Sequence, residues 1–387
     1  MDKERYIFEK FRSKLNGDDC AVIGERAYCK DLFVEGVHFR RGWLSLREIG
    51  AKAMLVNISD MIATNARPKY ALLGLALPRE IGTREIDELC AGVSETAREW
   101  GIRIIGGDTI GSDRIALSVS LIGECKRPVF RSGARVGDLI AHTGELGSVG
   151  RDLAVLLRDE ISPASSQTQN RNDKISSLQS SNNALQGLNT EASAAQNPGD
   201  EVRSPDDKIS SARAKLQSLD AENSAQNSVS RSRDDHKSPT AQSLACENSV
   251  SQSPAYEGSV FDLREDMRAK ISKNSRFVRP VLRDKFFYKA AKFISAAMDI
   301  SDGLAQDLPR LLEASGVGVR WIARPSEAAL QSGEEYEILF SFAPKFLPKI
   351  YAIAAKAGVS INIIAEVCPR TPQSSMEFHG SSHHFAP

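Results

Sequence analysis

The stretch MDISDGLAQDL, residues 298–308, sets two carboxylates, Asp299 and Asp302, between apolar residues. It follows the apolar run ISAA and leads into LPRLLEASGVG, where leucines recur at helical spacing and Gly316 lies past the end. This pattern predicts a strand, a sharp turn and a helix, with both carboxylates close to the turn. Charged groups in apolar surroundings need a compensating partner, so this corner of the fold is a candidate functional site.

Similar alternations of strand and helix occur elsewhere in the chain. Ser45 and Glu48 form a capping box ahead of IGAKAMLVNISDMIATNA, whose apolar residues have helical spacing. A second helix is expected from near Thr83 to Gly101. KYALLGLAL, IRIIGG, IALSVSLIG and LIAHTG have the length and composition of strands. We therefore predict an α/β (α+β) fold with two domains.

Composition divides the chain into three regions. Residues 161–259 consist mainly of Ser, Asn, Gln, Ala and Asp, with too few apolar residues to form a core. We expect this segment to be a disordered, low-complexity insert. The N-terminal domain is expected over residues 1–135, and the C-terminal α/β domain over residues 136–160 and 260–387.

The overall charge argues against two classes of partner. Lys+Arg and Asp+Glu both total 50, so no global positive field would attract nucleic acid or an anionic membrane. No run of about 18 apolar residues occurs, and the first residues are charged. The cysteines form no CxxC pair, which is typical of reduced thiols. A cytoplasmic protein that binds neither nucleic acid nor membrane is expected.

Aspartates recur near predicted strand ends, turns and helix faces. An aspartate at any one of these places is most simply a cap or a turn residue. Taken together, several carboxylates converging on one cleft would repel one another unless a divalent cation lay among them. Hard oxygen ligands favour Mg²⁺ over zinc, and phosphates commonly complete such a site. The aspartates concerned are Asp19, Asp31, Asp60, Asp108, Asp299 and Asp302.

Phosphate-binding motifs are less direct. The chain has no GxxxxGK[ST] motif and no HRD or DFG set, which excludes a Walker P-loop and a protein kinase. The remaining candidates are the GGDT turn that contains Gly107, Arg131 in RSGARVGD, and the glycine-rich segment 144–150. Glycine lets the backbone approach a phosphate closely, and arginine offers a forked cationic contact.

The motifs GDDCAV, KDLFVEGVHF, LVNISDM, IGGDT, RSGARVGD, MDISDGLAQDL and SGEEYEILF, in this order, resemble thiamine-monophosphate kinases. These belong to an ATP-binding superfamily with aminoimidazole ribonucleotide synthetase and selenophosphate synthetase. The resemblance implies a homodimer whose N-terminal sheets form a shared barrel, with an ATP cleft between the barrel and the C-terminal domain. It also implies transfer of the ATP γ-phosphoryl group to thiamine monophosphate, which gives thiamine diphosphate and ADP.

The resemblance assigns roles to individual residues. The six aspartates match the family's magnesium ligands. Gly107, Arg131 and Ser301 match nucleotide contacts, and Lys30 and Asp108 are added to that set. His38 and Glu334 match positions that contact the thiamine substrate, although a hydrogen-bonded structural histidine and a solvated strand entrance remain the alternatives. No catalytic base is expected, because a phosphate acceptor is already deprotonated at neutral pH.

The chain also departs from the family pattern. Cys29 and Lys30 stand where hydroxyl residues are usual, and Ser332 and Glu335 replace a glycine and an aspartate. Ser382 stands where an aromatic residue is expected, so Phe378 could stack on the substrate instead. Two alternatives therefore stay open. One is a related synthetase with another acceptor, although no reactive cysteine or glycine-rich loop precedes the first acidic motif. The other is a nucleotide-binding protein without turnover.

Overall fold

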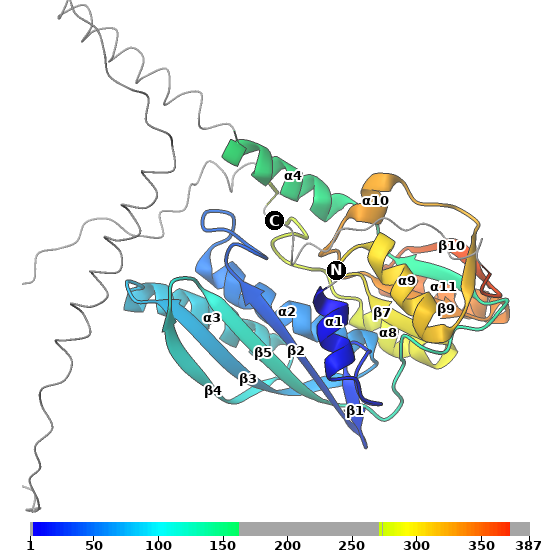
Figure 1. Cartoon of the computed structure of the whole chain (residues 1–387), viewed down its shortest axis with the longest axis horizontal. Coiled ribbons are helices and arrows are strands. Elements are labelled where there is room, and N and C mark those ends of the chain that lie inside the picture. The colour runs from blue at the N-terminus through cyan, green and yellow to red at the C-terminus, as the bar shows by residue number, and fades with distance from the viewer. Residues whose placement is uncertain (1–2, 162–270, 273, 372–387) are drawn as a thin grey trace, which may run out of the picture. The chain divides into compact units, whose positions relative to one another are not determined.

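The computed structural model describes residues 3–161, 271–272 and 274–371 (Figure 1). The predicted insert, Phe378 and Ser382 lie outside the described residues, apart from residue 161. The N-terminal elements are α1 (Lys3–Lys10), β1 (Ala21–Ile23), β2 (Arg26–Val34), α2 (Leu46–Ala63), β3 (Arg67–Pro78), α3 (Thr83–Glu99), β4 (Arg103–Ser112) and β5 (Ala116–Glu124). The later elements are β6 (Leu139–Thr143), α4 (Ser148–Ile161), α8 (Asp284–Ala290), η2 (Ala291–Phe293), β7 (Ala296–Asp299), α9 (Leu304–Ser315), β8 (Gly318–Trp321), α10 (Glu327–Gln331), β9 (Ile338–Phe342), η3 (Pro344–Phe346), α11 (Leu347–Ala357) and β10 (Ile361–Cys368).

The first sheet has the strand order β1-β2-β5-β3-β4. Its pairs are antiparallel except for β3 and β4, which are parallel and are connected through α3. Helices α2 and α3 lie along one face of this sheet (Figure 1). Strand β2 alternates accordingly, with Phe33 buried on the helix side and Leu32 exposed on the outer face.

Helix α2 begins at the predicted capping box. The Ser45 hydroxyl accepts the Glu48 N–H at 3.2 Å, and the Glu48 carboxylate accepts the Ser45 N–H at 2.8 Å. The helix contacts α3, β2 and β5 as well as β7 and α8 of the second half, so it is buried on nearly all sides. Its polar residues Lys52, Asn57 and Ser59 are buried too, and each needs a polar partner inside the protein.

The second sheet has the order β7-β9-β6-β10-β8, and all its pairs are antiparallel. The predicted strand, turn and helix are present as β7, the residues after Asp299, and α9. Gly303 adopts φ +100° in the turn, and α9 ends at Gly316 with φ +67°, both in the left-handed region that glycine tolerates. The mixed fold with two sheets is confirmed, whereas the predicted domain boundaries remain predictions. In the part of the chain that the structure describes, no helix is long and apolar enough to cross a bilayer.

Candidate functional site

Three of the predicted metal ligands converge. One carboxylate oxygen from each of Asp19, Asp60 and Asp299 lies within 4.8 Å of the others. Asp19 precedes β1, Asp60 lies in the last turns of α2, and Asp299 ends β7. Elements from both halves of the chain therefore deliver one acidic cluster.

The carboxylates of the cluster hold protons more tightly than isolated ones. Burial raises the pKa of Asp60 well above its usual value, and the charges of Asp31, Asp299 and Asp19 raise it further. Burial likewise raises the pKa of Asp299, with Asp19 adding to the effect. A cluster of buried oxygen ligands that repel one another fits a hard divalent cation, which would favour their ionised forms.

Arg131 partly neutralises the cluster. Its Nε and Nη2 donate to Asp19 Oδ1 at 3.0 and 2.5 Å, and its backbone N–H donates to Asp18 Oδ1 at 2.6 Å. Burial raises the pKa of Asp19, and Arg131 opposes that rise. Arg131, which was predicted to contact phosphate, therefore forms an ion pair with one of the three clustered aspartates.

Asp302 lies three residues after Asp299 and is not one of the three clustered carboxylates. Its carboxylate pairs with Arg310 at 2.6 Å, and its backbone N–H, like that of Ser301, donates to Asp307 Oδ2 at 3.1 Å. Asp307 is fully buried, which raises its pKa to about 7. Asp307 was not predicted to be functional, although its position in the first turn of α9 is where carboxylates cap helices.

The second motif divides between the two faces of the sheet. Asp31 faces α2, and its negative charge contributes to the raised pKa of Asp60. Its backbone N–H donates to Asn57 Oδ1 at 3.0 Å. Cys29 is also on this face, with its thiol donating to the Asn57 carbonyl at 3.4 Å. Lys30 is exposed on the opposite, outer face, so within one chain it does not point toward the cluster.

Asp108 and Gly107 are not brought to the cluster within a single chain. Strand β4 is exposed along its length, and Asp108 pairs with Gly74, which pairs with Ser118 on the outer face of the sheet. The Asp108 carboxylate accepts the N–H of Thr109 at 2.9 Å. A side chain at Gly107 would meet the Leu73 carbonyl oxygen at 1.8 Å, so this glycine is required by strand packing alone.

The two predicted substrate contacts have definite local roles. His38 Nδ1 accepts the Val34 N–H at 3.1 Å, and its ring lies 5.5 Å from that of Phe33. Glu334 pairs through Oε2 with Lys52 Nζ at 2.8 Å. Its backbone N–H donates to the Ser301 carbonyl at 2.6 Å, so Glu334 is tied to the turn that carries the metal motif.

A buried ion cluster holds the 332–337 loop, which connects α10 to β9 and carries Glu334. Glu335 and Glu337 are both fully buried. Arg276 contacts their carboxylates at 3.0 and 2.8 Å, and Arg283 forms a two-pronged ion pair with Glu337. Sequence reasoning did not assign this role to Glu335 and Glu337 of SGEEYEILF, because their arginine partners are distant in the sequence.

Two residues of α2 were also missed. Ser59 Oγ donates to Asp299 Oδ2, and Lys52 holds Glu334, so both link α2 to the second half of the chain. The composition of α2 could have indicated both residues. A helix that is apolar on all sides is buried, so its few polar residues must contact polar partners inside the protein.

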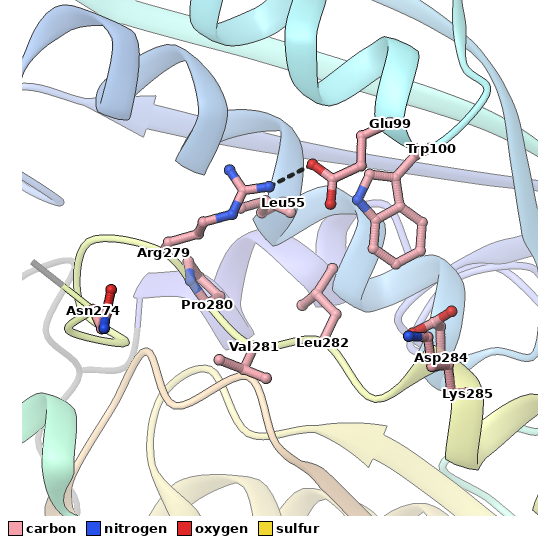
Figure 2. Close-up of a pocket in the computed structure, with 10 residues that line it drawn as sticks. All are labelled: Leu55, Glu99, Trp100, Asn274, Arg279, Pro280, Val281, Leu282, Asp284 and Lys285. Atoms are coloured by element: carbon pink, nitrogen blue, oxygen red, sulfur yellow. Dashed lines mark hydrogen bonds and ion pairs between the residues drawn. The ribbon is translucent and has the colours of Figure 1, made fainter. Parts of the chain in front are cut away.

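A separate hollow of about 560 Å³ lies away from these residues (Figure 2). Figure 2 shows Arg279 paired with Glu99 at its edge, beside Trp100, which follows α3. The distance of this ion pair is 2.5 Å. None of the predicted site residues lines it. We therefore assign the candidate site to the acidic cluster.

Two family models match the chain. The N-terminal domain of AIR synthase related protein matches residues 17–125, and the corresponding C-terminal domain matches residues 273–374. Together they span more than half of the sequence. The chain belongs to the AIR synthase related family. The family membership expected from the ordered motifs is thus confirmed.

Two curated relatives of the chain are both named thiamine-monophosphate kinase. Thiamine-monophosphate kinase of Aquifex aeolicus is 35% identical over 166 residues, which are 41% of this chain and 53% of the relative. The Bacillus subtilis enzyme of the same name is 36% identical over 161 residues, 40% and 49% of the two chains. The chain therefore spans about half the length of the curated relatives it matches.

Solved structures share the fold of this chain. A structure described as AaThiL complexed with AMPPCP and TMP has a TM-score of 0.59 at 22% identity, covering 95% of this chain and 90% of that one. The HypE–HypF complex has a TM-score of 0.54 at 15% identity, covering 95% and 93%. At these identities the likeness shows the architecture, which proteins with different names share, and the activity has to be argued from the site.

Proposed function

We propose that this protein transfers the γ-phosphoryl group of ATP to thiamine monophosphate, giving thiamine diphosphate and ADP. The observation that carries the proposal is the convergence of Asp19, Asp60 and Asp299 from three separate motifs. The curated relatives named thiamine-monophosphate kinase support the choice of acceptor. The structure described with AMPPCP and TMP supports a fold that holds an ATP analogue and TMP together.

The acidic cluster would hold Mg²⁺, with Asp31 and Asp302 as further ligands at its edge. Bound Mg²⁺ neutralises phosphate charge and aligns the reacting groups. The chain's own contribution is to fix the carboxylates. Ser59 orients Asp299, and Arg131 balances Asp19, which leaves a guanidinium beside the phosphate position. No side chain has to remove a proton, because the attacking phosphate oxygen is already ionised.

The remaining predicted contacts are part of the same proposal. Gly107, Ser301, Lys30 and Arg131 would contact ATP, and His38 and Glu334 would contact the thiamine moiety. Ser301 supports this assignment through its place beside Asp302 and through its carbonyl bond to the Glu334 N–H. The nucleotide and acceptor contacts would thereby meet at one turn.

We further propose that the protein is a homodimer paired through the outer face of the first sheet. This face exposes large apolar side chains on β2, β3 and β4 that a monomer would leave in water, among them Leu32, Leu72 and Ile110. Asp108 and Lys30 lie on the same face. Pairing of two such faces is the arrangement in which these residues, remote from the cluster of their own chain, would approach a phosphate.

A coupled assay for ADP release tests the activity. Purified protein with Mg²⁺, ATP and thiamine monophosphate should release ADP and form thiamine diphosphate in equal amounts. Two other compounds are tested as acceptors for comparison: thiamine, and the precursor of 5-aminoimidazole ribonucleotide. A folded protein that binds Mg²⁺ and ATP, yet forms no thiamine diphosphate, would exclude the proposal.

One alternative is a nucleotide-binding protein without turnover. It is favoured by Cys29, which occupies a buried position beside the cluster where the family usually has a hydroxyl, and by Lys30 on the outer face. Isothermal titration beside the product assay separates the two. Tight binding of MgATP without product formation would support the alternative.

A further inference from the structure

Lys52 is a charged residue in the interior of α2. Its side chain is 0% exposed, and its Nζ lies 2.8 Å from Glu334 Oε2 and 4.1 Å from the ring centroid of Phe277. Ion pairs at buried positions seldom stabilise a fold more than apolar residues of similar size would. Stability alone therefore does not explain a lysine at this position.

The partner of Lys52 is held on a strained backbone. Glu334 and Tyr336 have φ angles of +55° and +50°, in the left-handed region that residues other than glycine rarely adopt. Such strain persists where the surrounding structure enforces it, and it is concentrated at functional sites. The buried Arg276 and Arg283 cluster supplies that enforcement by fixing Glu335 and Glu337 on either side of Tyr336.

Glu334 keeps one side open to a ligand. Its side chain is 21% exposed, whereas that of Lys52 is fully covered. Lys52 engages Oε2, and no bond to Oε1 is found from any residue that the structure describes. A carboxylate oxygen can accept further hydrogen bonds, so Oε1 is the acceptor that this pair presents to a ligand.

The pair lies one ligand length from the metal cluster. Lys52 and Ser59 are two turns apart on one face of α2, which corresponds to about 10 Å along the axis. Ser59 is bonded to Asp299 of the cluster, and Lys52 is bonded to Glu334, so the separation of the two along α2 approximates the distance from the cluster to Glu334. His38 belongs to the same wall, since the Phe33 ring lies 5.5 Å from the His38 ring and 5.7 Å from Lys52 Nζ.

We propose that Lys52 is a positioning residue for the acceptor substrate: it fixes Glu334 so that Oε1 accepts a hydrogen bond from the nitrogen-bearing ring of a phosphate ester whose phosphate lies at the acidic cluster. Because Lys52 cancels the charge of Glu334, the pair offers an oriented acceptor and little net charge. It therefore selects a neutral N–H donor, such as an amino group on an aromatic ring. This inference rests on the proposed function.

The test compares Lys52→Met, Glu334→Gln, the double variant and Arg47→Met. Arg47 lies on the same helix and forms exposed ion pairs with Glu88 and Glu95, so it is the matched control. Each single change at the pair should raise KM for thiamine monophosphate about tenfold, with kcat and KM for ATP within about twofold of the parent. The double variant should be no worse than the poorer single variant, and Arg47→Met should change none of these values.

A second substrate identifies the group that is recognised. The parent protein should use a thiamine monophosphate analogue, in which a carbonyl oxygen replaces the ring amino group, about tenfold less efficiently than thiamine monophosphate. Lys52→Met and Glu334→Gln should lose this preference. A merely structural role for Lys52 would lower activity on both acceptors equally.

Several results would overturn the inference. An unchanged KM for thiamine monophosphate in Glu334→Gln does so even if Lys52→Met fails to fold. So does a rise in both KM values together with a loss of thermal stability. A parent protein without turnover of thiamine monophosphate overturns the proposed function and this inference with it, whereas an active parent with unaffected variants overturns this inference alone.

Discussion

Ser59 on α2 donates a 2.5 Å hydrogen bond to Asp299 at the end of β7, although the two residues are 240 positions apart in the sequence. The bond joins the two halves of the protein at the point where their carboxylates meet. Burial raises the pKa of Asp299, and the Ser59 hydroxyl opposes that rise. Ser59 thus both orients this carboxylate and favours its ionised form.

Ser59→Ala should raise the Mg²⁺ concentration needed for half-maximal turnover and lower kcat/KM about tenfold, because a charge-assisted hydrogen bond is lost. Steady-state rates over a Mg²⁺ series measure both effects. Ser341→Ala is the control, since the buried Ser341 hydroxyl has no hydrogen-bond partner among the described residues. Equal behaviour of the two variants would show that Ser59 does not support the metal site.

Asp60→Ala and Asp299→Ala should each lower turnover by at least about 100-fold, because they remove carboxylates that would hold the proposed Mg²⁺ against the phosphates. Deletion of residues 165–250 should cost only a few-fold, since no predicted site residue lies there. Initial rates of ADP release, with circular dichroism to verify folding, provide the comparison. Comparable losses from the deletion would contradict this division.

The stabilisation by Mg²⁺ should increase with pH. The pKa values of Asp19, Asp60 and Asp299 are raised above 3.8 by burial, so without metal their contribution to stability is fully present below about pH 4 and is lost as pH rises through the raised values. Mg²⁺ binds only the ionised carboxylates and opposes that loss. Thermal denaturation with and without MgCl₂ should show a larger shift in Tm at pH 8 than at pH 6.

The control for this pH effect is Asp60→Asn, which removes one ionising group from the cluster. Its Mg²⁺-induced shift should be smaller and should depend less on pH. A parent shift that is the same at pH 6 and pH 8 would mean that the cluster does not release protons on binding metal.

Arg283→Met should lower the free energy of unfolding by about 1.5–3 kcal/mol, because it removes charge-assisted hydrogen bonds from the fully buried Glu337, which keeps Arg276 as its one arginine partner. Urea denaturation measures the loss. Arg320→Met breaks an exposed pair with Glu366 at 2.5 Å and should cost less than about 1 kcal/mol. Similar costs for the two variants would show that the buried cluster does not hold the 332–337 loop.

Leu32→Asp should convert the proposed dimer to a monomer, because a charge would be buried where two outer faces meet. Leu32 is 56% exposed in the single chain, and Ile322, at 57%, is a matched position on the other half. Sedimentation equilibrium should give a halved mass for Leu32→Asp and an unchanged mass for Ile322→Asp. A parent protein that is already monomeric would exclude the dimer.

Local signals were sufficient for the elements that carry the site. The Ser45 capping box predicted the start of α2, and the spacing around Asp299 predicted β7, the turn and α9, because caps and periodicity depend on nearby residues. The convergence of Asp19, Asp60 and Asp299 was reached from the number of acidic motifs and from the family resemblance. No spacing rule connects residues in a loop, a helix and a distant strand.

The partners of buried charges could not be predicted in the same way. Lys52 has Glu334 as its partner, and Glu337 has Arg276 and Arg283, all through contacts between segments far apart in the sequence. Asp108 shows the opposite limit. Its motif matched a metal ligand, yet its strand register directs it to the outer face, which only the folded sheet reveals.

The segments on either side of residues 162–270 both contact the 332–337 loop. Glu335 accepts the N–H groups of Gly147 and Val149 at 2.6 and 3.2 Å ahead of this interval, and it contacts Arg276 after it. An insertion between these two contacts is therefore expected to leave the 332–337 loop in place, because a longer surface loop adds little to the free-energy cost of closing it. The same interval is a place where an engineer could open new chain ends or graft a reporter domain.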